Sequence, residues 1–131
     1  MIKKINHIGI VVKDLTKGKS LFGSGLKLEH IRDEEISDFN CQIAFFSCGE
    51  VMLELIMPIG PGPSQDFLDK HGEGIHHICY EVDDIDFALQ ETRKIFSTNY
   101  QTPKTGAGGS KIFFLDPNSI CGVETEFVSL E

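Results

Sequence analysis

The stretch that decides the fold is residues 5–15, INHIGIVVKDL, which residues 75–85, IHHICYEVDDI, match position by position. Both begin with a strand-like run rich in β-branched residues, and each run ends in an acidic residue, Asp14 or Asp84, that can cap a helix. A match of this kind at a fixed offset indicates that the chain contains an internal repeat.

A second pair of matching segments lies downstream of the first. Residues 51–55, VMLEL, match residues 123–127, VETEF, and a glycine lies shortly before each. The first pair of segments is offset by 70 residues and the second pair by 72. The chain is therefore predicted to contain two structural units of roughly 65 residues each.

Each unit is predicted to run as one strand, one helix and then three strands, which is a βαβββ module. The expected elements of the first module are a strand at 4–12, a helix at 14–22 and strands at 27–34, 41–48 and 51–57. Those of the second are a strand at 75–82, a helix at 84–96 and strands at 99–103, 111–116 and 121–128. The predicted fold class is α+β, with two tandem βαβββ modules in one domain spanning residues 1–131.

A segment rich in proline and glycine separates the two modules. Residues 58–63, PIGPGP, form a stiff turn-rich stretch, and a short helical turn is expected from Ser64 to Gly72. We therefore place module one at about residues 1–60, a linker at about 58–73 and module two at about 74–131.

The composition is that of an ordinary globular domain. Hydrophobic residues make up 40% of the chain, which is enough for a core. No apolar run approaches the roughly 18–20 residues of a membrane span, and the N-terminus enters a strand pattern without the features of a signal peptide. We therefore expect a cytoplasmic protein, whose four cysteines are small buried hydrophobic residues in a reducing compartment.

The net charge of −8 argues against a nucleic-acid partner, because phosphates require clustered lysine and arginine. The charge is unevenly distributed, however, since residues 1–30 hold six of the twelve cationic side chains. Two interpretations of this segment remain open: it contacts a phosphate-bearing ligand, or it is a solvated face.

Two histidines and two glutamates are candidate metal ligands because the repeat pairs them. His7 matches His77, and Glu54 matches Glu126. Both glutamates lie in otherwise apolar strands, where a lone carboxylate is costly to bury. Taken singly, each could be a hydrogen-bonded histidine or an exposed glutamate. Taken together, we predict that the four bind one divalent ion. Two imidazoles and two carboxylates suit Co²⁺, Ni²⁺, Zn²⁺ or Mn²⁺, and the residue types do not choose among these ions.

The repeated pattern and its motifs resemble the vicinal oxygen chelate superfamily, which includes glyoxalase I, extradiol dioxygenases and methylmalonyl-CoA epimerases. The resemblance covers about residues 4–128. Residues 66–77, DFLDKHGEGIHH, and residues 106–115, GAGGSKIFFL, are similar to the epimerases more than to the other members. The resemblance implies that the two modules form a curved mixed sheet around a metal site, and that the family's metal ligands correspond to His7, Glu54, His77 and Glu126.

The resemblance also implies a function, with two alternatives. The implied function is a metal-dependent epimerase that interconverts the epimers of 2-methylmalonyl-CoA by moving the α-proton through a metal-stabilised enolate. Its implied partners are an acyl-CoA or other thioester substrate and a second copy of the chain in a homodimer. A glyoxalase I-like isomerase acting on a glutathione hemithioacetal is the first alternative. A metal-free small-molecule-binding or resistance protein is the second.

Asp38 and Glu126 are the candidate catalytic residues. The resemblance implies that an acidic residue in a turn, usually glutamate in such epimerases, serves as a base, and residues 35–40, EISDFN, put Asp38 at that position. Aspartate is one methylene shorter than glutamate, so Glu35 is kept as an alternative base, and an ordinary loop carboxylate is the alternative interpretation of Asp38. The metal ligand Glu126 is expected to serve as the acid–base group on the other face of the substrate.

Overall fold

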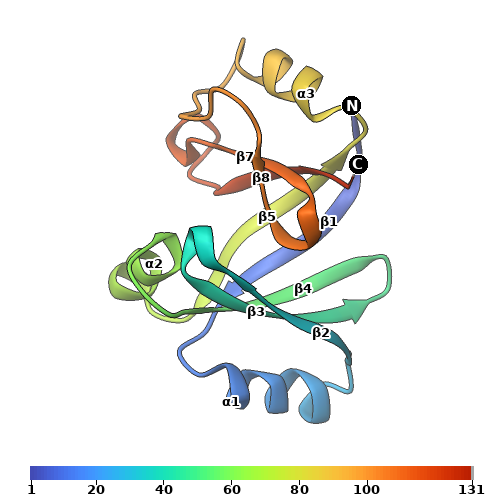
Figure 1. The fold of residues 1–131 in the computed structure, drawn as a ribbon, viewed down its shortest axis with the longest axis vertical. Helices are drawn as coiled ribbons and strands as arrows, with labels where there is room; N and C mark the ends of the chain where they lie inside the picture. The colour runs from blue at the N-terminus through green and yellow to red at the C-terminus, as the bar shows by residue number, and fades with distance from the viewer. Residues whose placement is uncertain (131) are drawn as a thin grey trace. The chain divides into compact units, whose positions relative to one another are not determined.

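The computed structural model describes residues 1–130 and contains, over that range, one eight-stranded sheet and three α-helices (Figure 1). The elements in chain order are β1 (Ile2–Val11), α1 (Leu15–Ser20), a π-helical turn (Leu21–Gly25), β2 (Glu29–Ile36), a 3₁₀ turn (Ser37–Phe39), β3 (Cys41–Cys48), β4 (Val51–Pro58), α2 (Pro63–His71), β5 (Gly74–Val82), α3 (Ile85–Thr92), β6 (Lys104–Thr105), a second 3₁₀ turn (Ala107–Gly109), β7 (Lys111–Leu115), a third 3₁₀ turn (Pro117–Ser119) and β8 (Thr125–Ser129).

The strand order in the sheet is β2-β3-β4-β1-β5-β8-β7-β6. The pairs β1–β4 and β5–β8 are parallel, whereas β2–β3, β3–β4, β6–β7 and β7–β8 are antiparallel. The first strand of each repeat therefore pairs in parallel with the last strand of the same repeat. The mixed α+β fold with two βαβββ modules is confirmed.

The described chain divides into two compact units. Unit 1 contains Met1–Asn6 and the chain from His77 onward, and unit 2 contains His7–His76. Both β1 and β5 therefore begin in one unit and continue into the other.

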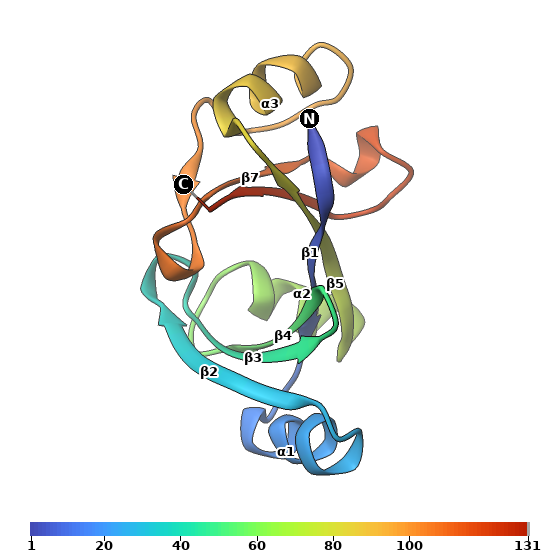
Figure 2. The same cartoon turned by 90° about the vertical axis from the view of Figure 1, so that its right-hand side faces the viewer.

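In unit 2, α1 packs on one face of the sheet (Figure 2). Its first turn is capped by Asp14, whose side chain accepts a hydrogen bond from the Lys17 backbone N–H at 3.1 Å. Because successive side chains of a strand point to opposite faces, Phe45 and Glu54 lie on the face opposite α1. The buried side chains on the α1 face are Val12, Leu15, Ala44, Phe46 and Leu55.

In unit 1, α3 packs in the corresponding way on β7 and β8. Asp84 caps it, accepting a hydrogen bond from the Phe87 backbone N–H at 3.0 Å. The rings of Phe113 and Phe127 stack beneath it with their centroids 4.8 Å apart. The buried side chains of this core are Val82, Ile85, Ala88, Leu89, Phe113, Leu115 and Phe127.

The predicted positions of two strands in the second module were partly wrong. The strand expected at 99–103 is replaced by bends, and only Lys104–Thr105 pairs as β6. The carbonyl oxygens of Tyr100 and Gln101 accept hydrogen bonds from the Arg93 guanidinium instead of joining a strand ladder. The strand expected from 121 begins at Thr125, because Cys121 and Gly122 both have positive φ, 58° and 77°, and form a turn.

Helix ends and cysteine burial also differ from the predictions. The helix expected to reach 96 ends at Thr92 and continues as a hydrogen-bonded turn, and the first helix passes into a π-helical turn after Ser20. The first module's second strand begins at Glu29 rather than at 27, since Lys27 has a φ of 65°. Cys41 and Cys79 are buried as predicted, but Cys48 and Cys121 are exposed, so the prediction was wrong for that pair.

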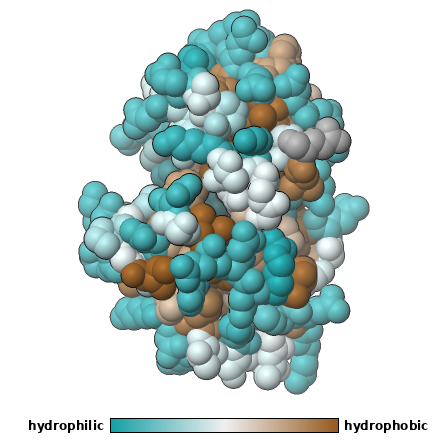
Figure 3. All heavy atoms as spheres, viewed as in Figure 1, coloured by the Kyte–Doolittle hydropathy of each residue, from teal (hydrophilic) through white to brown (hydrophobic). Residues whose placement is uncertain are grey.

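The described surface mixes hydrophilic and hydrophobic side chains, as one face shows (Figure 3). Exposed hydrophobic side chains include Ile2 and Ile5 of β1 and Ile75 of β5. None of the described helices combines the length and the apolar composition that crossing a membrane requires.

The caps at the starts of α1 and α3 allow a test of how local sequence stabilises the repeat. Replacing Asp84 by alanine removes the acceptor of the Phe87 N–H, and we expect the free energy of unfolding to fall by about 1 kcal/mol in urea denaturation. Asp84→Asn is the matched control, because its amide oxygen still accepts, and it should lose much less. Equal stability of the alanine variant and the unaltered protein would contradict a stabilising role for this cap.

Candidate metal centre

In unit 2 the sheet register brings His7 and Glu54 together. Gly9 of β1 lies opposite Glu54 of β4 in the parallel pair, and His7 precedes Gly9 by two residues, so it lies on the same face. The His7 Nδ1 atom is 2.9 Å from the Glu54 Oε2 atom. This contact joins the first and last strands of the first repeat.

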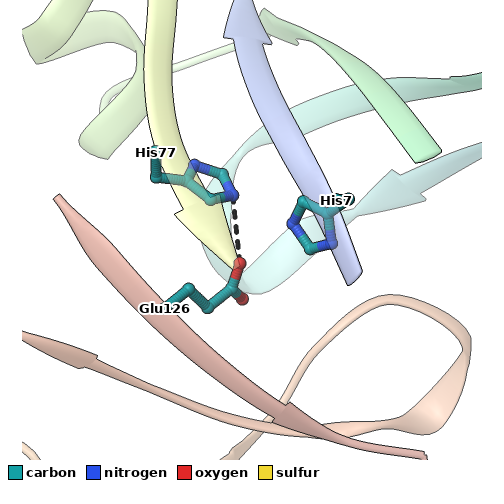
Figure 4. Close-up of side chains that lie close together, drawn as sticks. All are labelled: His7, His77 and Glu126. Atoms are coloured by element: carbon teal, nitrogen blue, oxygen red, sulfur yellow. Dashed lines mark ion pairs between the residues drawn. The ribbon is translucent and has the colours of Figure 1, made fainter. Parts of the chain in front are cut away.

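Unit 1 contains the equivalent pair in the equivalent register. Cys79 of β5 lies opposite Glu126 of β8, and His77 precedes Cys79 by two residues. The His77 Nε2 atom is 3.0 Å from the Glu126 Oε1 atom, and Figure 4 shows the ring directed at the carboxylate. The repeat inferred from sequence therefore holds for the paired residues, although His7 contacts its glutamate through Nδ1 and His77 contacts its glutamate through Nε2.

All four side chains are buried, with exposed fractions of only 5% or 6%. A buried carboxylate is costly unless a positive charge or hydrogen-bond donors compensate it. The partner of each carboxylate in these pairs is a histidine, and an imidazole can be neutral at physiological pH. Neutral imidazole nitrogens and carboxylate oxygens are together the donors that divalent transition-metal ions take, so the residues fit a bound cation.

Three of these residues, His7, His77 and Glu126, form a group that could hold a metal ion (Figure 4). Glu54 is outside this group and is connected to it through its contact with His7. The three residues match three of the four predicted ligands. The complete four-ligand set and the identity of the metal remain predictions.

In unit 2 the surroundings of Glu54 are apolar. Phe45 of β3 is its cross-strand neighbour and is almost completely buried. Cys41, on the same strand face as Phe45, has its thiol pKa raised to about 11 by burial and by the negative charge of Glu54. The raised pKa disfavours the thiolate, which is the nucleophilic form of cysteine.

In unit 1, two residues near His77 and Glu126, namely Phe114 and Tyr100, were not predicted from the sequence. The Phe114 ring packs edge-on against His77 at a centroid distance of 5.5 Å, and Phe114 lies opposite Glu126 in the β7–β8 register. Burial raises the pKa of Tyr100, and the carboxylates of Glu126 and Glu124 raise it further. Burial also raises the pKa of Glu124. The pairing of β7 with β8 was the signal that could have identified Phe114.

The predicted base Asp38 lies in the 3₁₀ turn between β2 and β3 and is exposed. Glu35, the alternative base, pairs with Gln42, which in turn pairs with Met57. Met57 packs against the buried cluster under α1, so this row of side chains lies on the face opposite Glu54. The sheet register therefore disfavours Glu35 and leaves Asp38 as the candidate.

The sequence profile of the Glyoxalase/Bleomycin resistance protein/Dioxygenase superfamily matches residues 6–114 of this chain. An ethylmalonyl-CoA/methylmalonyl-CoA epimerase of Cereibacter sphaeroides is 34% identical, over 98% of this chain and 100% of its own length. The crystal structure of a hypothetical protein from Bacillus halodurans superimposes with a TM-score of 0.95 at 34% identity, covering 98% of this chain and 94% of that chain.

A methylmalonyl-CoA epimerase of Streptomyces coelicolor in complex with 2-nitronate-propionyl-CoA superimposes with a TM-score of 0.93 at 28% identity, covering 98% of both chains. The resemblance to methylmalonyl-CoA epimerases that the sequence indicated is thus confirmed.

The neighbouring histidines of β5 provide a test of the metal ligands. His77→Ala should lose the bound metal, because it removes an imidazole from the predicted set, whereas His76→Ala should retain it, since His76 packs against the Phe67 ring at 5.0 Å. Metal content per chain after dialysis, measured by plasma mass spectrometry, distinguishes the variants. Equal retention by both would contradict the assignment of His77.

Proposed function

We propose that this chain, which belongs to the Glyoxalase/Bleomycin resistance protein/Dioxygenase superfamily, is a metal-dependent epimerase that interconverts the epimers of 2-methylmalonyl-CoA. The observation that carries the proposal is the pair of buried His–Glu contacts, one in each repeat, at equivalent positions of the sheet. The similarity of the whole chain to methylmalonyl-CoA epimerases supports the choice of substrate.

In this proposal His7, Glu54, His77 and Glu126 bind one divalent cation. Co²⁺, Ni²⁺, Zn²⁺ and Mn²⁺ all suit two nitrogen and two oxygen donors. The bound cation supplies electrostatic stabilisation for the negative charge that develops on a carbonyl oxygen when the neighbouring proton leaves. The burial of the four side chains supports this role, because electrostatic interactions are stronger where water is excluded.

The proton itself is moved by carboxylates of the chain. Epimerisation requires that the α-proton is removed on one face of the carbon and returned on the other. We assign the Asp38 carboxylate to one face and the Glu126 carboxylate to the other, with a rate contribution of roughly 10²–10⁴-fold from such acid–base groups. Exposure of Asp38 in a turn supports access to a bound substrate, and the burial of Glu126 beside His77 supports a held orientation.

The proposed protein is a homodimer that acts on acyl-CoA thioesters. Exposed isoleucines on β1 and β5, Ile2, Ile5 and Ile75, support a contact with a second copy, because burying them would remove apolar surface from water. The substrate is a thioester whose α-carbon also bears a carboxylate, which makes its α-proton acidic.

Exchange of the α-hydrogen tests the proposed function directly. We expect metal-loaded protein to replace the α-hydrogen of methylmalonyl-CoA by deuterium in D₂O, in a proton NMR time course, much faster than metal-free protein. Exchange at the uncatalysed rate, in protein shown to hold one metal per chain, would contradict the function. The glutathione–methylglyoxal hemithioacetal would then be the next substrate to examine.

Two variants extend the exchange experiment to the base. Asp38→Asn removes a carboxylate of the proposed pair, so exchange should slow by roughly 10²–10⁴-fold while metal content stays the same. Glu35→Gln, which makes the same chemical change on the sheet face opposite Glu54, should exchange at the unaltered rate. Unimpaired exchange by the asparagine variant would assign the role to another residue.

The proposed homodimer is tested by the molar mass in solution. Light scattering should give twice the chain mass of 14.6 kDa. Replacing Ile75 by a charged residue, Ile75→Glu, should shift the mass toward that of one chain, because burying the carboxylate would be costly. A single-chain mass for the unaltered protein would contradict the dimer.

A further inference from the structure

One strand of unit 2 contains a β-bulge that changes the face on which its residues lie. In the β2–β3 pair, His30 lies opposite Phe46 and Arg32 lies opposite Phe45, so Ile31 is an extra residue without a partner. In a regular strand without a bulge, His30 and Arg32 would lie on the same face, because residues two positions apart point the same way. The bulge therefore places these two side chains on opposite faces of the sheet.

Contacts of the side chains confirm this assignment of faces. The His30 ring packs against Phe46, a core residue of the α1 face, at a centroid distance of 5.2 Å. The Arg32 guanidinium instead lies over the Phe45 ring, 3.9 Å from its centroid. Because Phe45 is the cross-strand neighbour of Glu54, Arg32 lies on the face that carries this predicted metal ligand.

Arg32, Phe45 and Glu54 thus form one cross-strand row over β2, β3 and β4. The backbones of β2 and β4 are roughly 10 Å apart at this row, because adjacent strands are about 4.8 Å apart. The Arg32 side chain spans part of that separation by lying on the Phe45 ring. A positive charge is therefore held beside the predicted metal centre, with an aromatic ring between it and the Glu54 carboxylate.

The guanidinium is oriented but remains accessible. One nitrogen, Nη2, donates to Glu34 Oε1 at 3.1 Å, and the side chain is 44% exposed. A guanidinium carries five N–H donors, so this single bond uses only part of its capacity. An exposed Arg–Glu pair contributes little stability by itself. The contact with Glu34 is better explained as holding the Arg32 guanidinium in one orientation. The paired N–H groups of a guanidinium match the two oxygens of a carboxylate in geometry.

We propose that Arg32 binds the free carboxylate of the acyl group and so selects acyl thioesters that bear this carboxylate over those that lack it. The inference rests on the proposed function, because it takes the acyl group to be bound beside Glu54. It favours the acyl carboxylate over the CoA phosphates, since the phosphates lie at the far end of the pantetheine arm from the thioester. Arg32 would be a specificity-determining residue that moves no proton.

The test compares two ligands that differ by this carboxylate. Methylmalonyl-CoA and propionyl-CoA are titrated by calorimetry into metal-loaded protein and into the Arg32→Gln variant. We expect the variant to bind methylmalonyl-CoA roughly 10- to 100-fold more weakly, the loss of a charge-assisted hydrogen bond, while its affinity for propionyl-CoA is unchanged. Arg32→Lys keeps the charge without the fork and should give an intermediate loss.

Lys19→Gln is the matched control, because it removes the same charge from the opposite face of the sheet. Lys19 Nζ contacts Asp33 at 2.6 Å, and Asp33 lies opposite Ala44 of the α1 core. This variant should bind both ligands as the unaltered protein does, and thermal unfolding should show that both variants are folded.

Three results would overturn the proposal for Arg32. If the Arg32→Gln variant bound both ligands more weakly by the same factor, Arg32 would contact a part of the CoA that the two ligands share. If its affinity for methylmalonyl-CoA were unchanged, the contact with the acyl carboxylate would be excluded. Binding of methylmalonyl-CoA no tighter than propionyl-CoA by the unaltered protein would remove the selectivity that Arg32 is proposed to supply. Absence of α-hydrogen exchange would count against the proposed epimerase alone, because the Arg32 result is measured by binding.

Discussion

The structure depends on the burial of two glutamates on apolar strands. An ionised carboxylate in such a place must be compensated, and each repeat meets this requirement in the same way, with a histidine from the first strand facing a glutamate from the last. The parallel pairing of these strands is what brings the two residues together. A slip of one residue in either pair would move the glutamate to the opposite face, so the register of the sheet and the chemistry of the centre depend on each other.

The repeat and the buried pairs could be predicted because their signals lie in single residues. His7 and His77 stand at matched positions of two similar segments, and Glu54 and Glu126 interrupt apolar strands, so residue identity alone marked them. The acidic residues after the first strands likewise predicted two capped helices, and both caps are present. Local rules of strand alternation and capping are sufficient for such features.

The remaining features depend on contacts between distant residues, which the sequence does not display. The sequence gives no sign that the Arg93 guanidinium donates hydrogen bonds to the carbonyl oxygens of Tyr100 and Gln101, which were expected to pair in a strand. Phe114 appears as an ordinary core residue until its register opposite Glu126 is known. The predicted module boundaries, the catalytic assignment of Asp38 and the fourth ligand Glu54 stay predictions, because nothing observed in the fold tests them.

The bulge at Ile31 has a consequence for how related chains are aligned. A bulge adds one residue to one strand of a pair, so an alignment across β2 that places no gap at this residue does not show on which face of the sheet each side chain lies. If a homologue lacks the bulge, an ungapped alignment of β2 pairs residues that lie on opposite faces of the sheet in the two proteins, for every position on one side of the bulge. A bulge that lies one position away has the same effect between the two bulge positions. Apparent substitutions at these columns, including a change of charge at Arg32, would then reflect a change of geometry and not of chemistry. Sequence divergence in this strand should therefore be read only after the bulge has been located in each structure.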